Sequence, residues 1–186
     1  MVDTRSSPIE LSRKTALDAA ENLLQIKGWK ALTAARVAEA CGMSRQWLHT
    51  LFGGQQQLVD ALVDSVFGHW RAKQLELMAA RQPLSETVAR NFALILDSPP
   101  TVAMVLRQTM VDQTEREATM WAEIHDWWKP LWQAERSAPD EEDRAVTTTL
   151  FAASVALEPT VRNHLLDSST ATAVVIGAIK GSLKIR

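Results

Sequence analysis

The chain has 186 residues, of which 46% are hydrophobic and 23% charged, with 20 Lys and Arg against 22 Asp and Glu. This is the composition of a globular protein with a sizeable core, and it excludes the collagen-like and low-complexity classes. Residues 1–11 hold no apolar run and no stretch of about 18 apolar residues occurs, so we expect neither a secretory signal nor a membrane span. The single Cys41 cannot form an internal disulfide, which favours a cytoplasmic protein.

The formal charge of −2 is unevenly distributed along the chain. Residues 1–56 carry seven Lys and Arg against five Asp and Glu, a net +2, so the remaining residues carry thirteen against seventeen, a net −4. A basic N-terminal part permits contact with a polyanion, because neutralising phosphates requires local positive charge. An asymmetry of this size is equally compatible with chance scatter.

Helical patterns run through the whole chain, and no segment shows the sustained period-2 alternation of a strand. The first expected helix opens with a capping box at Ser7 and Glu10 and ends before Gly28. Thr33 and Ser44 can cap the next two helices. The expected helices span residues 8–27, 34–41, 45–51, 55–81, 85–96, 101–110, 115–136, 139–157 and 169–184. The sequence therefore predicts an all-α protein.

Pro130 lies inside an expected helix, and Pro159 follows the end of another. Pro130 should kink or break the helix over 115–136, and Glu158-Pro159 should bend the eighth helix before it resumes towards residue 166. Gly53 and Gly54 mark a natural division, so we predict one domain over 1–54 and a second over 55–186, linked by the helix over 55–81.

The stretch from Thr33 to Phe52 has the pattern of a helix-turn-helix. Gly42 permits the positive φ of a sharp turn, and small Ala38 lets the two helices approach closely. Polar side chains then project from a second helix that is slim enough to enter the major groove of DNA. An ordinary αα-hairpin would produce a similar pattern.

The same region resembles the TetR family of bacterial transcription regulators over about residues 12–60. The resemblance rests on these residues: Ala19-Ala20, Leu23-Leu24, Gly28-Trp29, Leu32-Thr33, Val37-Ala38, Ala40-Cys41-Gly42-Met43-Ser44, Leu48, Phe52 and Leu58. It implies a three-helix DNA-binding head, a helical ligand-binding and dimerisation body, and no cofactor. The DNA-binding residues expected on this basis are Thr33, Arg36, Ser44, Arg45, Gln46, Trp47, His49, Thr50 and Gln55.

The recognition positions depart from the family pattern. Gln46-Trp47 replaces Gly-Thr, His49 replaces a phosphate-contacting Tyr, and Gln55 replaces a Lys. We therefore expect weaker anchoring to the DNA backbone, or compensation from the basic residues Arg13, Lys14, Lys27 and Arg36. Arg45 can pair with guanine and Gln46 with adenine, whereas Trp47 can contact the DNA or pack within the protein.

The body is rich in tryptophan, with four Trp between residues 121 and 132. Such side chains are most ordinarily core, but they can also surround a cavity for an apolar or aromatic effector. The candidate effector residues are Trp70, Phe92, Met104, Gln108, Trp121, His125, Trp128 and Trp132.

One recognition helix reads few base pairs, so we expect a homodimer on a pseudo-palindromic operator. In the family the last two helices of each subunit form the dimer, and intramolecular packing is the alternative. The candidate interface residues are Leu150, Ala153, Leu157, Ala173, Ile176, Gly177 and Lys180.

An enzyme is disfavoured, because no catalytic or nucleotide-binding motif occurs and the four His lack metal-ligand spacing. The sequence instead predicts a ligand-responsive regulator, by default a repressor that its effector releases from DNA. The alternative is a helical interaction protein whose altered head no longer binds DNA.

Overall fold

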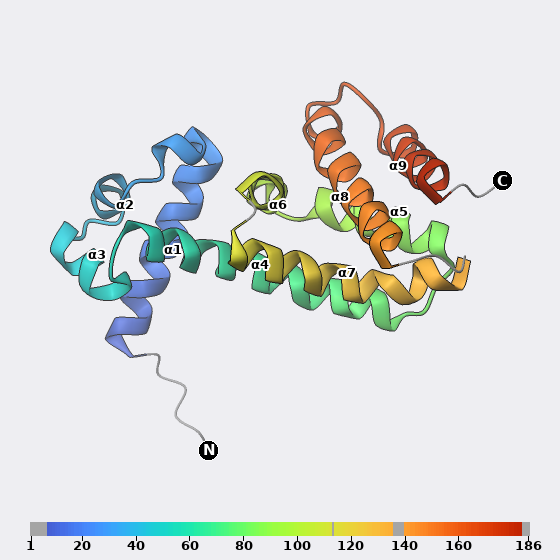
Figure 1. Ribbon diagram of the computed structural model, residues 1–186. Coiled ribbons are helices and arrows are strands. Elements are labelled where there is room, and N and C mark those ends of the chain that lie inside the picture. The colour runs from blue at the N-terminus through green and yellow to red at the C-terminus, as the bar shows by residue number, and fades with distance from the viewer. Residues whose placement is uncertain (1–6, 113, 136–139, 184–186) are drawn as a thin grey trace, which may run out of the picture. The chain divides into compact units, whose positions relative to one another are not determined.

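The structure is a computed structural model that describes all residues except 1–6, 113, 136–139 and 184–186 (Figure 1). The described residues form nine α-helices and one short 3₁₀ helix, and they contain no strand, which confirms the all-α prediction. They divide into two compact units, the first ending at Gly68 and the second beginning at His69. The division lies inside helix α4 (Gln55–Ala79), beyond the glycine pair at which the sequence suggested it.

The first unit is built on α1 (Pro8–Lys27), α2 (Ala34–Ala40) and α3 (Arg45–Phe52), which pack against one another. The expected capping box is present, since Ser7 Oγ accepts from the Glu10 amide and Glu10 Oε2 accepts from the Ser7 amide. A 3₁₀ turn (Trp29–Ala31), which the sequence did not predict, joins α1 to α2. The core is made of small and branched side chains: Ala16, Ala20, Leu24, Val37, Ala38, Leu48 and Phe52.

The second unit contains α5 (Leu84–Asp97), α6 (Pro100–Asp112), α7 (Glu115–Glu135), α8 (Asp140–Arg162) and α9 (Ser168–Leu183). Helix α8 is its centre, because it packs against α5, α6, α7 and α9 (Figure 1). Among the described residues, no helix combines the length and the apolar character that crossing a membrane requires.

Helices α7 and α8 continue through their prolines, so the expected break at Pro130 is wrong and residues 140–162 form one helix through Pro159. A proline removes one backbone hydrogen bond, and packing on both sides of it can compensate for the loss. Trp128 and Trp132, which flank Pro130, are fully buried. Tertiary packing therefore outweighs the tendency of a proline to break a helix.

Asp167 caps α9 through three hydrogen bonds. Its carboxylate accepts from the Thr170 amide at 2.9 Å, from Ser169 Oγ at 2.5 Å and from Thr170 Oγ1 at 2.6 Å. These bonds, led by the one from Ser169, hold the pKa of the Asp167 carboxyl well below its ordinary value. A carboxylate of this kind stabilises the fold at every pH at which it stays ionised.

We expect this cap to make stability pH-dependent. Because the folded pKa is depressed, the contribution is fully present above the unfolded pKa of about 4 and is lost as pH falls below it. The melting temperature of Asp167→Ser, which keeps a capping oxygen but does not titrate, should therefore converge on that of the wild type between about pH 5 and pH 2. A constant difference over that range would show that the ionised carboxylate contributes nothing.

Candidate nucleic-acid interface and effector cavity

Two side-chain caps and one turn fix the geometry of α2 and α3. Thr33 Oγ1 accepts from the Arg36 amide at 3.3 Å, and Ser44 Oγ accepts from the Trp47 amide at 3.0 Å, as the sequence predicted. Between them Gly42 has a φ of 69°, in the left-handed region that favours glycine. The helix-turn-helix geometry thus follows from local chemistry.

Helix α3 separates its side chains into two faces. Leu48 and Phe52 are buried at 2% and 8% exposure, and they anchor the helix to the rest of the first unit. The other face is exposed and carries most of the predicted DNA-contacting residues: Arg45, Gln46, Trp47, His49 and Thr50. Trp47 retains 39% of its surface, which is large for a tryptophan and disfavours the alternative in which it packs within the protein.

The remaining predicted DNA contacts lie around this face. Arg36 and Ser44 are exposed and Thr33 is half-buried. Gln55, which occupies the position of the family's usual Lys, is exposed and uses its Oε1 to accept from the Ala34 amide at 3.5 Å. The Gln55 side-chain oxygen therefore accepts from the first residue of α2, so the side chain does not extend freely into solvent.

Two of the basic residues expected to compensate for the missing Lys are already engaged. Arg13 Nη1 donates to the Leu51 carbonyl at 2.7 Å, and its guanidinium lies 4.5 Å from the centroid of the Phe52 ring. Lys14 pairs with Asp18 at 2.6 Å on the exposed surface. Lys27 and Arg36 are exposed and line a hollow that also contains Glu39.

Arg13 is a structural support for α3, and we expect its removal to be measurable. Arg13→Ala should lower the free energy of unfolding by about 1–2 kcal/mol, because it removes a charged hydrogen bond and a cation–π contact near the surface. Lys14→Ala, which removes an exposed ion pair, should change it by less than about 0.5 kcal/mol. Urea unfolding followed by circular dichroism compares the two variants, and equal effects would contradict this role for Arg13.

In the second unit, four of the eight predicted effector residues are core. Trp70, Phe92, Trp128 and Trp132 have at most 1% exposure. Trp128 stacks on Trp132 with ring centroids 5.2 Å apart, and Phe151 of α8, which the sequence did not single out, contacts Trp70, Trp121 and Trp128 edge-on. These aromatic side chains pack against one another and leave little surface for a ligand.

Trp121 and His125 instead line a hollow among α6, α7 and α8, which we call the α6–α8 cavity. Its larger part has a volume of about 320 Å³, lined by Thr109, Met110, Ala118, Trp121 and Thr148. Its smaller part, about 170 Å³, is lined by Ala118, Trp121, Ala122, His125, Arg144, Thr147 and Thr148. The two parts adjoin, because Ala118, Trp121 and Thr148 line both.

The predicted residues Met104 and Gln108 are half-buried on α6 and do not line either part of this cavity. Gln108 Nε2 donates to Asp112 Oδ1 at 2.7 Å, so its amide is engaged on its own helix. The sequence placed Met110 in the segment rich in Trp and Met but not among the candidate effector residues. It missed Ala118, Arg144 and Thr148, since neither their types nor their spacing marked them.

A hydrogen-bond network at Thr147 defines the polar end of the cavity. Thr147 Oγ1 donates to the Asp143 carbonyl at 2.9 Å and accepts from Trp132 Nε1 at 2.8 Å. His125 Nδ1 lies 3.5 Å from the same oxygen. Burial lowers the pKa of His125, and the positive charge of Arg144 lowers it further, so the imidazole is neutral at pH 7. The hydroxyl has already donated its one proton, so His125 Nδ1 is the donor in this contact and Nε2 carries a lone pair.

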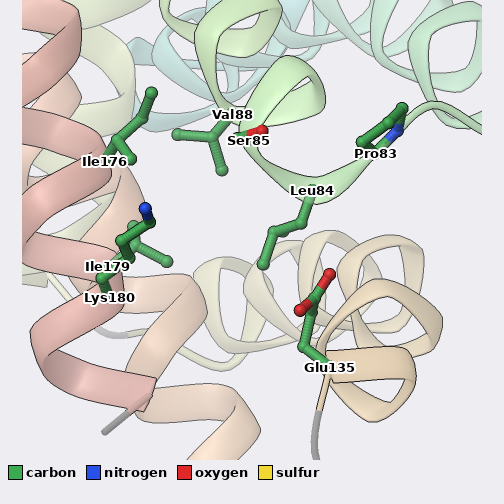
Figure 2. A pocket seen from close by; sticks show the side chains of 8 residues that line it. All are labelled: Pro83, Leu84, Ser85, Val88, Glu135, Ile176, Ile179 and Lys180. Atoms are coloured by element: carbon green, nitrogen blue, oxygen red, sulfur yellow. The ribbon is translucent and has the colours of Figure 1, made fainter. Parts of the chain in front are cut away.

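The predicted dimer residues are divided between surface and core. Ala173, Gly177 and Lys180 are exposed, Ala153, Leu157 and Ile176 are half-buried, and Leu150 is fully buried inside the unit. Ile176 and Lys180 also line a cavity of about 270 Å³ between α5 and α9. Figure 2 shows Val88 of α5 facing Ile176 of α9 across it, with Glu135 at the end of α7.

The comparisons with known proteins agree on one family. The model of the TetR family of bacterial regulatory proteins matches residues 16–62. The HTH-type transcriptional regulator AlkX of Mycobacterium tuberculosis is 41% identical over 64 residues, which cover 30% of this chain and 30% of that protein. The regulator BetI of Rhizobium meliloti is 30% identical over 95 residues, covering 49% and 47%. The matched regions thus span less than half the length of these two relatives.

Similarity in fold extends over the whole chain. A TetR-like transcriptional regulator from Rhodococcus sp. RHA1 superposes with a TM-score of 0.69 and covers 98% of this chain and 100% of its own, at 15% sequence identity. Identity this low supports the shared fold and no finer property.

Proposed function

We propose that this chain, which belongs to the TetR family of bacterial regulatory proteins, is a ligand-responsive repressor that binds a pseudo-palindromic DNA operator as a homodimer. One observation carries the proposal: α3 buries Leu48 and Phe52 and exposes Arg45, Gln46, Trp47, His49 and Thr50. A helix held in this way fits the major groove of DNA, where polar side chains read base edges. Operator DNA lies in the cytoplasm, where we expect the protein to act.

The proposed roles follow from side-chain chemistry. Arg45 would pair with guanine and Gln46 with adenine, because each matches the hydrogen-bonding pattern of that base in the major groove. His49, Thr50, Arg36 and the capped start of α2 at Thr33 would contact phosphates and position the protein. Trp47 would lie against a sugar or a thymine methyl group.

We propose that the outward surface of α9 and the adjoining part of α8 form the homodimer interface. The exposed residues of α9 include Ala173, Val174, Gly177 and Gly181, which are small or apolar and allow helices to approach closely. Leu157 and Ala153 of α8 are half-buried and can extend this surface, whereas buried Leu150 stabilises the subunit and is left out. A two-fold dimer would present two copies of α3 to half-sites about 34–36 Å apart.

We place the effector in the α6–α8 cavity, which is partly apolar and holds a few convergent polar groups. A ligand releases DNA only to the extent that it binds the DNA-free state more tightly, and shifting 1:99 to 99:1 needs about 5.5 kcal/mol. Relief of repression by a small apolar or aromatic molecule is the simplest arrangement that satisfies this requirement.

The experiment that tests DNA binding is a salt titration. Fluorescence anisotropy of labelled genomic fragments should show specific binding that falls by about 10³–10⁵ between 50 and 200 mM salt, if six to ten phosphates are contacted. The second candidate, an interaction protein with an inactive head, is favoured by Gln55 at the usual Lys position and by the engaged side chains of Arg13 and Lys14. It predicts no salt-dependent binding to any fragment.

A further inference from the structure

The α6–α8 cavity has ends of different chemistry. Met110, Ala118 and Trp121 supply apolar surface in its larger part. His125, Arg144 and Thr147 converge in its smaller part. A ligand that fills both parts must therefore be amphipathic, with an apolar body and one polar head.

Positive charge at the polar end comes from Arg144. Its side chain is exposed and makes no ion pair with the residues that the structure describes. His125 adds no charge at pH 7, because its imidazole is neutral. A guanidinium at the edge of a partly apolar cavity is complementary to an anionic acceptor group.

The opposing charge is Asp143, whose buried carboxylate also has no hydrogen-bond partner in the described part of the chain. It does not line either part of the cavity, whereas Arg144 does. The group that a ligand meets is therefore the guanidinium. An amine directed at Asp143 is the competing possibility, and a matched set of probes separates the two.

The volume sets the size of the ligand. The two parts of the cavity hold about 320 Å³ and 170 Å³, which places the cavity in the lower half of the range of small-molecule pockets, about 300–1,000 Å³. We infer that the effector is a small amphipathic carboxylic acid, its carboxylate bound by Arg144 and its apolar body lying against Met110, Ala118 and Trp121. This inference rests on the proposed effector role of the second unit.

The test compares three probes that share one apolar chain: octanoate, octan-1-ol and octylamine. Isothermal titration calorimetry of the full chain at pH 7 should show octanoate binding at least about tenfold more tightly than the alcohol, since a charged hydrogen bond is worth about 1.5–3 kcal/mol. The amine should bind more weakly than either. Equal binding of acid and alcohol, tighter binding of the amine, or no binding of any probe would overturn the inference.

Single substitutions test whether Arg144 binds the carboxylate of the probe. Arg144→Gln should reduce octanoate affinity to that of the alcohol, a loss of about tenfold or more, and leave the alcohol unchanged. The control Arg90→Gln, which removes an exposed cation paired with Glu86 on α5, should change neither. Ala118→Leu narrows both parts of the cavity and should weaken acid and alcohol alike. Unchanged octanoate binding in Arg144→Gln would contradict the assignment.

Affinity for DNA is measured on the same preparations without any probe. A protein that binds DNA with the expected salt dependence but shows no preference for the acid would disprove this inference and leave the proposed function intact. A protein that binds octanoate through Arg144 but binds no DNA would disprove the proposed function and leave the assignment of the carboxylate to Arg144 intact.

Discussion

If the proposed homodimer reads a base with each Arg45, Arg45→Ala should weaken operator binding by about 2–6 kcal/mol, because each of two subunits loses a bidentate contact worth about 1–3 kcal/mol. The structure supports a contact of this kind. Arg45 is the first residue of α3, its side chain is exposed, and Ser44 caps the helix immediately before it. The Arg45 guanidinium can therefore extend outward from the N-terminal end of α3.

Titration of the variant against the operator and against operators with one base pair changed shows what Arg45 contacts. If it reads a base, Arg45→Ala should lose discrimination at one position in each half-site and keep it elsewhere. If all sequences weaken alike, Arg45 binds phosphate. Unchanged affinity for every DNA would remove Arg45 from the interface. Lys30→Ala, a substitution outside α3, controls for the general loss of one positive charge.

Arg162→Ala should lower the free energy of unfolding by about 3 kcal/mol, because it leaves a buried carboxylate without the cation that compensates its charge. Glu158, only 4% exposed, is the partner of Arg162. Arg162 Nη2 also donates to the Ile95 carbonyl at 3.1 Å and to the Ser98 carbonyl, which links the end of α8 to the end of α5. The Glu158 carboxylate is more buried than the carboxylates of the ion pairs Lys14–Asp18, Arg71–Glu123 and Arg90–Glu86.

Urea unfolding followed by circular dichroism measures this loss. Arg90→Ala breaks the exposed pair with Glu86 and should cost less than about 0.5 kcal/mol. The double variant Glu158→Leu and Arg162→Leu should recover most of the stability that Arg162→Ala loses, since no unpaired charge remains. A loss in Arg162→Ala no larger than that in Arg90→Ala would contradict this account of the ion pair.

Features governed by local chemistry could be predicted from the sequence. The caps at Ser7, Thr33 and Ser44 depend on hydrogen bonds within three residues, and all three are present. The exposed face of α3 follows from helical periodicity once Leu48 and Phe52 are assigned to the core. The exposure of these side chains was therefore predictable residue by residue, whereas their contact with DNA stays a prediction.

Features that depend on packing between distant helices were not predictable. Whether Trp128 and Trp132 line a pocket or fill the core depends on Phe151 and Thr147 of α8, which meet them only in the folded protein. Helical periodicity also places Leu150 on the apolar face of α8, but it does not indicate whether that face contacts the same subunit or a partner. The structure buries Leu150 inside the subunit.

The α6–α8 cavity was the least predictable feature, because its lining comes from three separate helices. Met110 lies on α6, Ala118 and Trp121 lie on α7, and Arg144 and Thr148 lie on α8. None of these residue types signals a ligand in isolation. A cavity forms where the side chains of neighbouring helices do not fill the space between them. The sequence of one helix does not show how it packs against the others.

The most direct test of the central claim is selection of genomic DNA fragments by the purified protein, followed by footprinting of the selected fragments. The account predicts enrichment of a pseudo-palindrome whose half-sites lie about one helical turn, 34–36 Å, apart or a multiple of it, and loss of that enrichment in the double variant Arg45→Ala and Gln46→Ala. Enrichment of no sequence, or the same enrichment by the double variant, would contradict the claim that the exposed face of α3 reads DNA.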